Sequence, residues 1–380
     1  MPWKETCTMD QRIKFVIHYL EHELPMAALC REFGISRKTG YKMVWRYLEL
    51  GFDGLRDQSR APYHHPHAVP ESVEGAIVLA RHRHPTWGPK KLRVWLGWQD
   101  PSISWPAAST IGEILNRHGL TVPRRRSRKG APYNEPFISC KSPNAVWSAD
   151  FKGWFTTGDG IRCDPLTITD NYSRYLLRCQ AVRPTGYDAV QPVFEAAFRE
   201  YGLPVAIRTD NGPPFATTTV ASLSRLSIWW LKLGLVPERI EPGKPSQNGR
   251  HERMHRTLKQ ETASPPKRTW AAQQKAFDRF CDEYNRERPH EAIDMQAPVE
   301  LYSQSVREYP LILPEMVYPD DMVIRFVKAQ GDISWKNRHV YLSKTLAGEP
   351  VGLQQINDRI WDIYFGPIRL AQLDNDEKRL

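Results

Sequence analysis

Two aspartates lie on predicted strands, one within a strand and one at the end of a strand. In residues 147–155 apolar and polar side chains alternate, which predicts a strand with Asp150 on its polar face. Aspartate has a poor strand propensity, so its position within a strand calls for a chemical reason. Asp210 ends the apolar run 205–209 and precedes an Asn-Gly turn. Ligands in α/β sheets gather at the carboxyl ends of strands, where Asp210 would lie.

A third acid, Glu252, lies in a predicted helix at about 246–262, with Met254 and Leu258 on the buried side. One face of this helix is shared by Asn248, Glu252, Arg256 and Lys259. On this face the acid Glu252 therefore lies beside two basic residues. Three carboxylates from two strands and a helix form an oxygen-ligand site suited to one or two Mg²⁺ or Mn²⁺ ions. Two such ions about 3.5–4 Å apart can activate a water or a 3′-hydroxyl and stabilise the leaving oxygen in phosphoryl transfer.

Other acids and one zinc motif compete with this interpretation. Asp164 is a competing acid, whereas Asp159 in a Gly-rich hairpin and Asp170 before a turn occupy positions that aspartate fills for backbone reasons. Residues 251–255 spell HExxH, the helix motif of zinc metalloproteases. The cations around this motif would repel a dication, so a zinc protease is a remote alternative. We expect His251 and His255 to make hydrogen bonds on the helix surface or to contact phosphate.

The elements that would position these acids form an α/β domain. Its predicted strands and helices alternate along residues 145–303. Strands are expected at about 146–156, 162–169, 174–182 and 204–209. Helices are expected at about 186–202, 217–233, 246–262 and 269–285.

Residues 9–50 have the periodicity of three helices with a tight turn at Gly34, which is the helix-turn-helix pattern. Ser36 is the expected N-cap of the third helix. Its predicted apolar stripe is Tyr41, Val44, Trp45 and Leu48. The residues suited to base edges and phosphate are Arg37, Lys38, Thr39 and Lys42. A plain three-helix bundle with a basic solvated face is the alternative.

The segments that follow are a linker, a second helical unit and a basic linker. Residues 61–70 are rich in proline and histidine, and helices are expected at about 71–83, 90–96 and 106–117. This unit could be another helix-turn-helix. The basic linker, 123–144, contains a cluster of cations: Arg124, Arg125, Arg126, Arg128 and Lys129. Such a run is often only a solvated tether, but here it could follow DNA phosphates.

Composition limits the classes of protein that remain. The 380 residues include 53 Lys+Arg and 43 Asp+Glu, a formal net charge of +10, which favours a polyanionic partner. No apolar run approaches the roughly 20 residues of a membrane span, and no secretory signal is evident at the N-terminus. The six cysteines form no CxxC pair, so we expect them to be reduced and mostly buried. We therefore predict a cytoplasmic protein without a membrane partner.

Taken together, these motifs resemble the integrase-core (DDE) transposases of bacterial insertion sequences, relatives of the retroviral integrases. The matching segments are Trp147-Ser148-Ala149-Asp150-Phe151-Lys152-Gly153, Thr209-Asp210-Asn211-Gly212, Asn248-Gly249-Arg250-His251-Glu252-Arg253, and Tyr284-Asn285-Arg286-Glu287-Arg288-Pro289-His290 followed by Pro298. The resemblance implies a ribonuclease-H-like core with Asp150, Asp210 and Glu252 as the metal-binding catalytic triad. The interval between Asp210 and Glu252 is longer than is typical of that superfamily, and we assign the excess to about 222–230.

The resulting expectation is a multidomain transposase. Its predicted parts are a helix-turn-helix domain (1–60), a linker (61–70), a second helical domain (71–122), a basic linker (123–144), a catalytic core (145–303) and a small β-barrel (304–380). It would bind the terminal inverted repeats of its element and catalyse metal-dependent strand cleavage and strand transfer, as a polynucleotidyl transferase with two Mg²⁺ or Mn²⁺ ions per active site.

The expected partners are double-stranded DNA, both element ends and target, and further copies of the same chain. Joining two ends to one target requires at least a dimer when the protein is assembled on DNA. The expected location is the bacterial cytoplasm, on the nucleoid when bound to DNA. The main alternative is a DNA-binding regulator whose integrase-like core is inactive.

Overall fold

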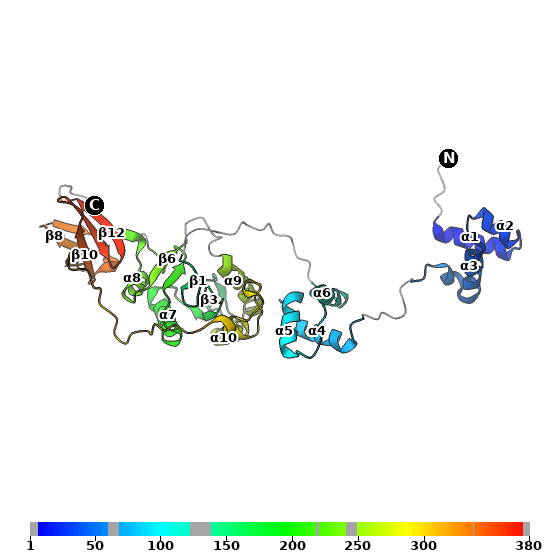
Figure 1. Cartoon of the computed structure of the whole chain (residues 1–380), viewed down its shortest axis with the longest axis horizontal. Helices are drawn as coiled ribbons and strands as arrows, with labels where there is room; N and C mark the ends of the chain where they lie inside the picture. The colour runs from blue at the N-terminus through cyan, green and yellow to red at the C-terminus, as the bar shows by residue number, and fades with distance from the viewer. Residues whose placement is uncertain are drawn as a thin grey trace. The chain divides into compact units, whose positions relative to one another are not determined.

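The computed structural model describes residues 7–59, 68–121, 138–217, 220–240, 249–336 and 338–374. The chain divides into two compact units, Met1–Ala68 and Val69–Leu380 (Figure 1). Within the described ranges, no helix has both the length and the apolar character needed to cross a membrane. The six cysteines are free: three are buried, two are half-buried, and Cys7 is exposed.

The N-terminal unit contains three helices and a short 3-10 helix, and the three helices lie where the helix-turn-helix pattern predicted them. Its elements are α1 (Thr8–Leu20), α2 (Met26–Glu32), α3 (Arg37–Leu50) and the 3-10 helix η1 (Gly51–Leu55). The turn before α3 contains Gly34 at a φ of 63°. Ser36 then caps α3, because its hydroxyl accepts a hydrogen bond from the backbone N–H of Thr39 at 3.1 Å.

The buried face of α3 differs from the predicted stripe. Val44 is buried, but Tyr41, Trp45 and Leu48 are more than half exposed. The cause is Gly40, where α3 crosses its neighbours so closely that an added Cβ would lie 2.6 Å from the Cys30 sulfur. The helix therefore turns its glycine inward and leaves the aromatic side chains outside.

The second unit begins with a smaller helical bundle. Its helices are α4 (Glu71–Arg83), α5 (Pro89–Gln99) and α6 (Ala108–Arg117), close to the predicted bounds. Trp87 and Trp95 fill the core of this bundle together with apolar side chains from all three helices.

The core of the second unit is a mixed six-stranded sheet. Its strands are β1 (Val146–Phe151), β2 (Phe155–Thr156), β3 (Arg162–Asp170), β4 (Leu176–Val182), β5 (Ala206–Thr209) and β6 (Val236–Arg239). They lie in the order β2-β3-β1-β5-β6, with β4 paired to β3. β3 is antiparallel to β1 and β4, whereas β5 is parallel to β1 and β6. The α/β prediction is confirmed, but β6 was not expected because its short run contains Pro237 and two charged residues.

Helices cover both faces of this sheet. They are α7 (Tyr187–Tyr201), η2 (Val220–Ser222), α8 (Arg225–Lys232), α9 (Gly249–Thr262), α10 (Trp270–Arg286), η4 (Glu291–Ile293) and α11 (Pro298–Leu301). One apolar cluster joins α7 and α8 to Trp147 and Ala149 of β1. A second cluster joins α9 and α10 to β3 and β4. Because side chains alternate along β1, Asp150 belongs to the face that α9 covers.

The C-terminal segment forms two small sheets. Its elements are β7 (Val323–Phe326), β8 (Asp332–Trp335), β9 (Arg338–Tyr341), η5 (Lys344–Leu346), β10 (Pro350–Gln355), β11 (Ile360–Phe365) and β12 (Ile368–Asp374). Four strands pair in the order β12-β11-β10-β7, and β8 pairs only with β9 among the described strands. The predicted small β-barrel is therefore not confirmed, because the pairing does not close on itself.

Helix α8 packs on two sides. Leu226, Trp229 and Trp230 belong to the cluster against the central sheet, whereas Ile228 and Leu231 belong to the cluster of the C-terminal sheets. The Lys232 ammonium adds an ion pair with Glu349 at 2.9 Å. The additional residues between Asp210 and Glu252 thus include a helix that joins the core to the C-terminal sheets.

The α4–α6 bundle contacts α10. His84, which is buried, stacks on Trp87 at 3.8 Å, and its Nδ1 lies 2.9 Å from Oε1 of Glu283. Beside it, Arg83 donates a hydrogen bond to Glu287 at 3.0 Å. These polar contacts hold the α4–α6 bundle against α10.

Candidate active site

Strand register brings the first two predicted acids together. In the parallel pair β1–β5, Val146 lies beside Ala206 and Ser148 beside Arg208. Asp150 lies two residues after Ser148 in β1, and Asp210 lies two residues after Arg208, immediately beyond the end of β5. Adjacent strands are about 4.8 Å apart. Continuation of the same register would therefore give the two carboxylates neighbouring positions at the carboxyl ends of β1 and β5.

Asp210 is held at the turn that follows β5. Its Oδ1 accepts a hydrogen bond from the backbone N–H of Gly212 at 3.1 Å, and the Asn211 amide donates to the carbonyl oxygen of Ile240. Burial raises the pKa of Asp210, and the Gly212 hydrogen bond offsets part of this effect. The carboxylate thus lies in a partly desolvated position where a cation would stabilise its charge.

Two histidines fix α9 over β3. The Nε2 atoms of His251 and His255 lie 2.6 Å and 2.7 Å from the hydroxyl oxygen of Thr167. Thr167 pairs with Asp150 across the β1–β3 ladder, and its hydroxyl donates to the Asp150 carbonyl oxygen at 3.1 Å. The hydroxyl can donate once and accept twice, so both imidazoles donate to it from Nε2–H. α9 is thereby anchored directly opposite Asp150.

This anchor corrects the expectation for the two histidines. Both are buried, so they contact neither solvent nor phosphate from the helix surface. Burial lowers the pKa of His251 to about 3 and that of His255 to about 2, so both imidazoles are neutral. Each ring directs a nitrogen to Thr167, which gives the HExxH match a structural role in place of zinc binding. His255 Nδ1 lies 3.9 Å from Oδ2 of Asp150, and Lys152 is close enough to contribute to its lowered pKa.

Glu252 lies in the first turn of α9, where its side chain is exposed. The predicted packing of α9 is confirmed, because Met254 and Leu258 are buried. However, the carboxylates of Asp150, Asp210 and Glu252 do not all lie within 4.8 Å of one another in the described part of the chain. The fold thus carries two of the predicted acids on adjacent strands, or at their ends, and the third on α9.

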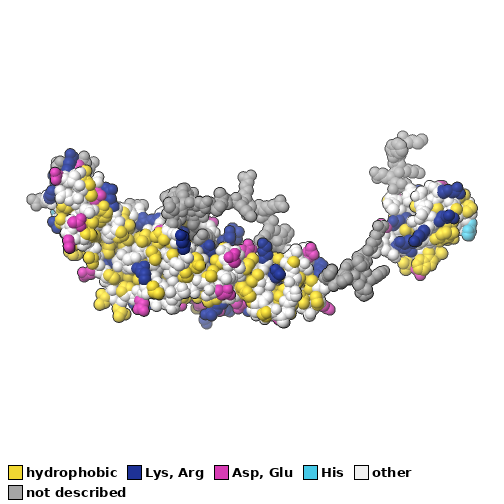
Figure 2. All heavy atoms as spheres, viewed as in Figure 1, with side chains coloured by type: hydrophobic (Ala, Val, Ile, Leu, Met, Phe, Trp, Pro, Cys, Tyr) yellow, Lys and Arg dark blue, Asp and Glu magenta, His cyan; other side chains and the backbone are white. Residues whose placement is uncertain are grey.

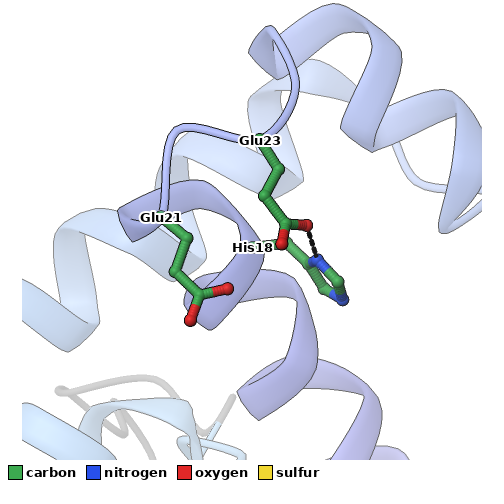
Figure 3. Close-up of side chains that lie close together, drawn as sticks. All are labelled: His18, Glu21 and Glu23. Carbon is green, nitrogen blue, oxygen red and sulfur yellow. Dashed lines mark hydrogen bonds and ion pairs between the residues drawn. The ribbon is translucent and has the colours of Figure 1, made fainter.

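A different set of potential ligands meets that distance limit. His18, Glu21 and Glu23 lie together at the end of α1 (Figure 3), and no other such group occurs among the described residues. Figure 3 shows His18 hydrogen-bonded to Glu23 through Nδ1. This hydrogen bond raises the pKa of His18, which favours an imidazolium ion. We interpret the group as an exposed ion pair, because the His18 Nδ1 already contacts the Glu23 carboxylate.

The competing acids have other partners. Asp170 accepts hydrogen bonds from the backbone N–H groups of Asn144 and Ser173, and Asp159 accepts one from Trp270. These contacts confirm the backbone roles predicted for both residues. Asp164, which is buried, forms an ion pair with Arg162.

The segment 284–290 has a structural role. The Asn285 amide forms hydrogen bonds with both the N–H and the carbonyl oxygen of Leu176, at 2.8 Å and 2.9 Å, which ties α10 to β4. Arg288 donates to Glu261 on α9 at 2.8 Å. The sequence marked this segment, but its partners lie too far along the chain to be identified from it.

The predicted DNA-contacting residues fall into three groups. Arg37, Lys38 and Lys42 are exposed on α3, whereas Thr39 is half-buried and its hydroxyl contacts the capping Ser36. Figure 2 shows Lys and Arg side chains gathered on the N-terminal unit. On α9, both Arg256 and Lys259 are exposed. The remaining residues lie outside the described part of the chain: Arg124, Arg125, Arg126, Arg128 and Lys129.

Comparison with known protein families gives matches along most of the chain. Integrase core domain families match residues 141–245 and 233–298. A helix-turn-helix domain family matches 11–63, and a homeodomain-like family matches 39–115. The C-terminal domain family of IS481 transposases matches 322–380.

Individual relatives include insertion-element proteins. The chain is 28% identical over 300 residues to an uncharacterized 31.7 kDa protein of insertion element IS407 from Burkholderia multivorans, covering 77% of this chain and 100% of the relative. It is 25% identical over 253 residues to an uncharacterized 39.2 kDa protein of IS476 from Xanthomonas euvesicatoria, covering 65% and 70%. A solved structure of the HTLV-2 integrase catalytic core domain in complex with magnesium is 14% identical, covers 43% of this chain and 99% of that chain, and has a TM-score of 0.34.

The family matches follow the order of the elements. The helix-turn-helix match covers the N-terminal bundle, the integrase matches cover the sheet that carries Asp150 and Asp210, and the transposase match covers the C-terminal sheets. The insertion-element relatives span most of the same length, and together with the family matches they support a bacterial insertion-sequence transposase with an integrase core.

Proposed function

We propose that Asp150, Asp210 and Glu252 form the catalytic centre at which this transposase cleaves and joins DNA strands. The observation that carries this proposal is the β1–β5 register, in which Asp150 and Asp210 each lie two residues beyond the last pair, Ser148 with Arg208. The Thr167 anchor adds the third acid, because it fixes the helix that bears Glu252 opposite Asp150.

The donor set fits magnesium or manganese. Three carboxylates provide the hard oxygen ligands that these ions prefer, and the neighbouring imidazoles are occupied by Thr167. Two bound ions would supply an activated nucleophile and neutralise charge on the leaving oxygen. Glu252 would complete this ligand set from the first turn of α9.

We further propose that the N-terminal unit recognises the terminal inverted repeats. In a helix-turn-helix domain the N-terminal residues of the last helix enter the major groove. Arg37, Lys38 and Lys42 are exposed in the corresponding part of α3, while Thr39 contributes to its cap. Arg256 and Lys259 would contact DNA phosphates near the catalytic centre, and the basic linker from Arg124 to Lys129 would follow the DNA between these sites.

The assembled form would contain at least two copies of the chain. Each active site acts on one DNA end, so joining two ends to one target requires two active sites in one complex. Double-stranded DNA of the element ends and of the target is therefore the partner that brings the copies together.

Cleavage by substituted proteins tests the catalytic assignment. We expect Asp150→Asn and Asp210→Asn to abolish Mg²⁺-dependent cleavage and strand transfer on a labelled duplex that carries the element end, while binding to that duplex is retained. Asp188→Asn is the matched control, since Asp188 is an exposed acid at the start of α7. Normal cleavage by Asp150→Asn would reject the assignment.

A binding-only regulator is the second candidate function. The observation that favours it is that the three carboxylates do not all lie within 4.8 Å of one another among the described residues, because an inactive core need not gather three acids. The same assay separates the two functions. A regulator would bind the element end but would not cleave it even as the unsubstituted protein with Mg²⁺ or Mn²⁺.

A further inference from the structure

An exposed tryptophan follows the first catalytic strand. Trp154 lies four residues after Asp150, and 63% of its surface is exposed. Four residues of extended chain span at most about 14 Å, so the two positions lie close together on one side of the core. This distance corresponds to about four nucleotides of a B-form strand at 3.4 Å each.

The backbone on both sides of Trp154 is fixed. Gly153 has a φ of 85°, which interrupts the strand and separates Trp154 from β1. β2 then begins with Phe155, which pairs with Cys163 of β3 and packs against the cluster between the sheet and α10. The indole is therefore attached to a short, well-anchored hairpin.

The indole also has a partner that supports it from one side. The guanidinium carbon of Arg162 lies 5.1 Å from the centroid of the Trp154 ring. Arg162 is itself held by two hydrogen bonds of 2.8 Å, from Nε and Nη2 to the carboxylate oxygens of Asp164. Asp164 is only 5% exposed, so a buried anion fixes the cation that supports an exposed aromatic ring.

A single exposed aromatic side chain needs no functional explanation. The arrangement of Asp164, Arg162 and Trp154 is different. The buried Asp164 carboxylate binds Arg162 on β3, and Arg162 supports the ring of Trp154, which directly precedes β2. Aromatic rings bind nucleobases by stacking, and arginine adds a cation for the adjoining phosphate. A base that unpairs beside a phosphate cleaved at Asp150 would lie within reach of this ring.

We propose that Trp154, supported by Arg162, is a stacking site for an unpaired nucleobase of the DNA end close to the cleaved phosphate. This inference rests on the proposed function for the location of the DNA. The ligand class is a nucleobase, recognised by its π-face and not by a particular sequence.

Binding to paired and splayed DNA ends tests this site. The probes are two fluorescent duplexes of the element end, one fully paired and one with three mismatched terminal pairs, measured with the full-length chain in EDTA so that no cleavage occurs. Trp154→Ala should weaken binding of the splayed duplex roughly 5- to 100-fold and change the paired duplex less than twofold. Trp154→Phe should retain most of the affinity, because it keeps an aromatic face.

Trp45→Ala is the matched control. Trp45 is also 63% exposed, but it lies on α3 of the N-terminal unit. Its loss should change the affinity for both duplexes equally. Equal effects of Trp154→Ala on both duplexes, or no effect on either, would overturn the proposal.

A 2-aminopurine base at an unpaired position reports stacking directly. We expect the unsubstituted chain and the Asp150→Asn variant to quench its fluorescence, and Trp154→Ala to leave it unquenched. Quenching that survives in Trp154→Ala would contradict the stacking site. The two proposals fail separately: normal cleavage by Asp150→Asn rejects only the catalytic assignment, whereas unchanged quenching in Trp154→Ala rejects only the stacking site.

Discussion

The hydroxyl of Thr167 should hold α9 in place, and Thr167→Val tests this. The substitution keeps the shape of the side chain but removes the atom that accepts hydrogen bonds from His251 at 2.6 Å and from His255 at 2.7 Å. Both imidazoles are buried and neutral, so two N–H donors would lose their partner without access to water. Each unsatisfied donor costs about 1–3 kcal/mol, which gives about 2–6 kcal/mol for the pair.

Hydrogen exchange measured by mass spectrometry on peptides from α9 is the suitable assay, because it reports the opening of one element in a multidomain chain. A loss of about 2 kcal/mol corresponds to roughly 30-fold faster exchange, which we expect as the minimum for Thr167→Val. Thr167→Ser retains the hydroxyl and should exchange close to the unsubstituted rate. Unchanged protection of α9 in Thr167→Val would refute the idea that this hydroxyl anchors the helix.

Three further outcomes follow from the described contacts. Leu231 belongs to the apolar cluster that joins α8 to the C-terminal sheets, so Leu231→Ala should lower the free energy of unfolding by about 2–5 kcal/mol. A loss below 1 kcal/mol in denaturant titration would contradict a core shared by α8 and these sheets. Partial burial lowers the pKa of His290 to about 3, so the folded state disfavours its protonation and stability should fall as pH drops from about 6.5 toward 3. His290→Gln should reduce that slope by about 1.4 kcal/mol per pH unit, and an unchanged slope would count against a neutral imidazole in the folded state. In duplex-binding titrations, Lys259→Ala should flatten the slope of log K against log salt by about one unit without changing sequence preference, whereas Arg37→Ala should weaken binding by about 1–3 kcal/mol at one position of the terminal repeat. The reverse pattern would exchange the roles of the two residues.

The sequence located the candidate site through local patterns. Alternation along β1 placed Asp150 on a polar face, and the apolar run before Asp210 marked the end of a strand. Helical periodicity identified the buried side of α9 from Met254 and Leu258. These features depend on near neighbours in the chain, which is why they could be predicted.

Features that depend on distant partners could not be predicted. Thr167 meets two histidines more than 80 positions later in the chain, and no local pattern connects them. The inward face of α3 depends on how closely Gly40 approaches Cys30, so the aromatic stripe was misplaced. Closure of the C-terminal sheets depends on pairing between strands, which periodicity does not determine.

The most direct test of the central claim is to locate Mn²⁺ by anomalous scattering in crystals of the full-length chain bound to its element end. We predict two peaks about 3.5–4 Å apart, contacted by Asp150, Asp210 and Glu252. The absence of any peak at the two aspartates, with Mn²⁺ bound instead at His18, Glu21 and Glu23, would contradict the account.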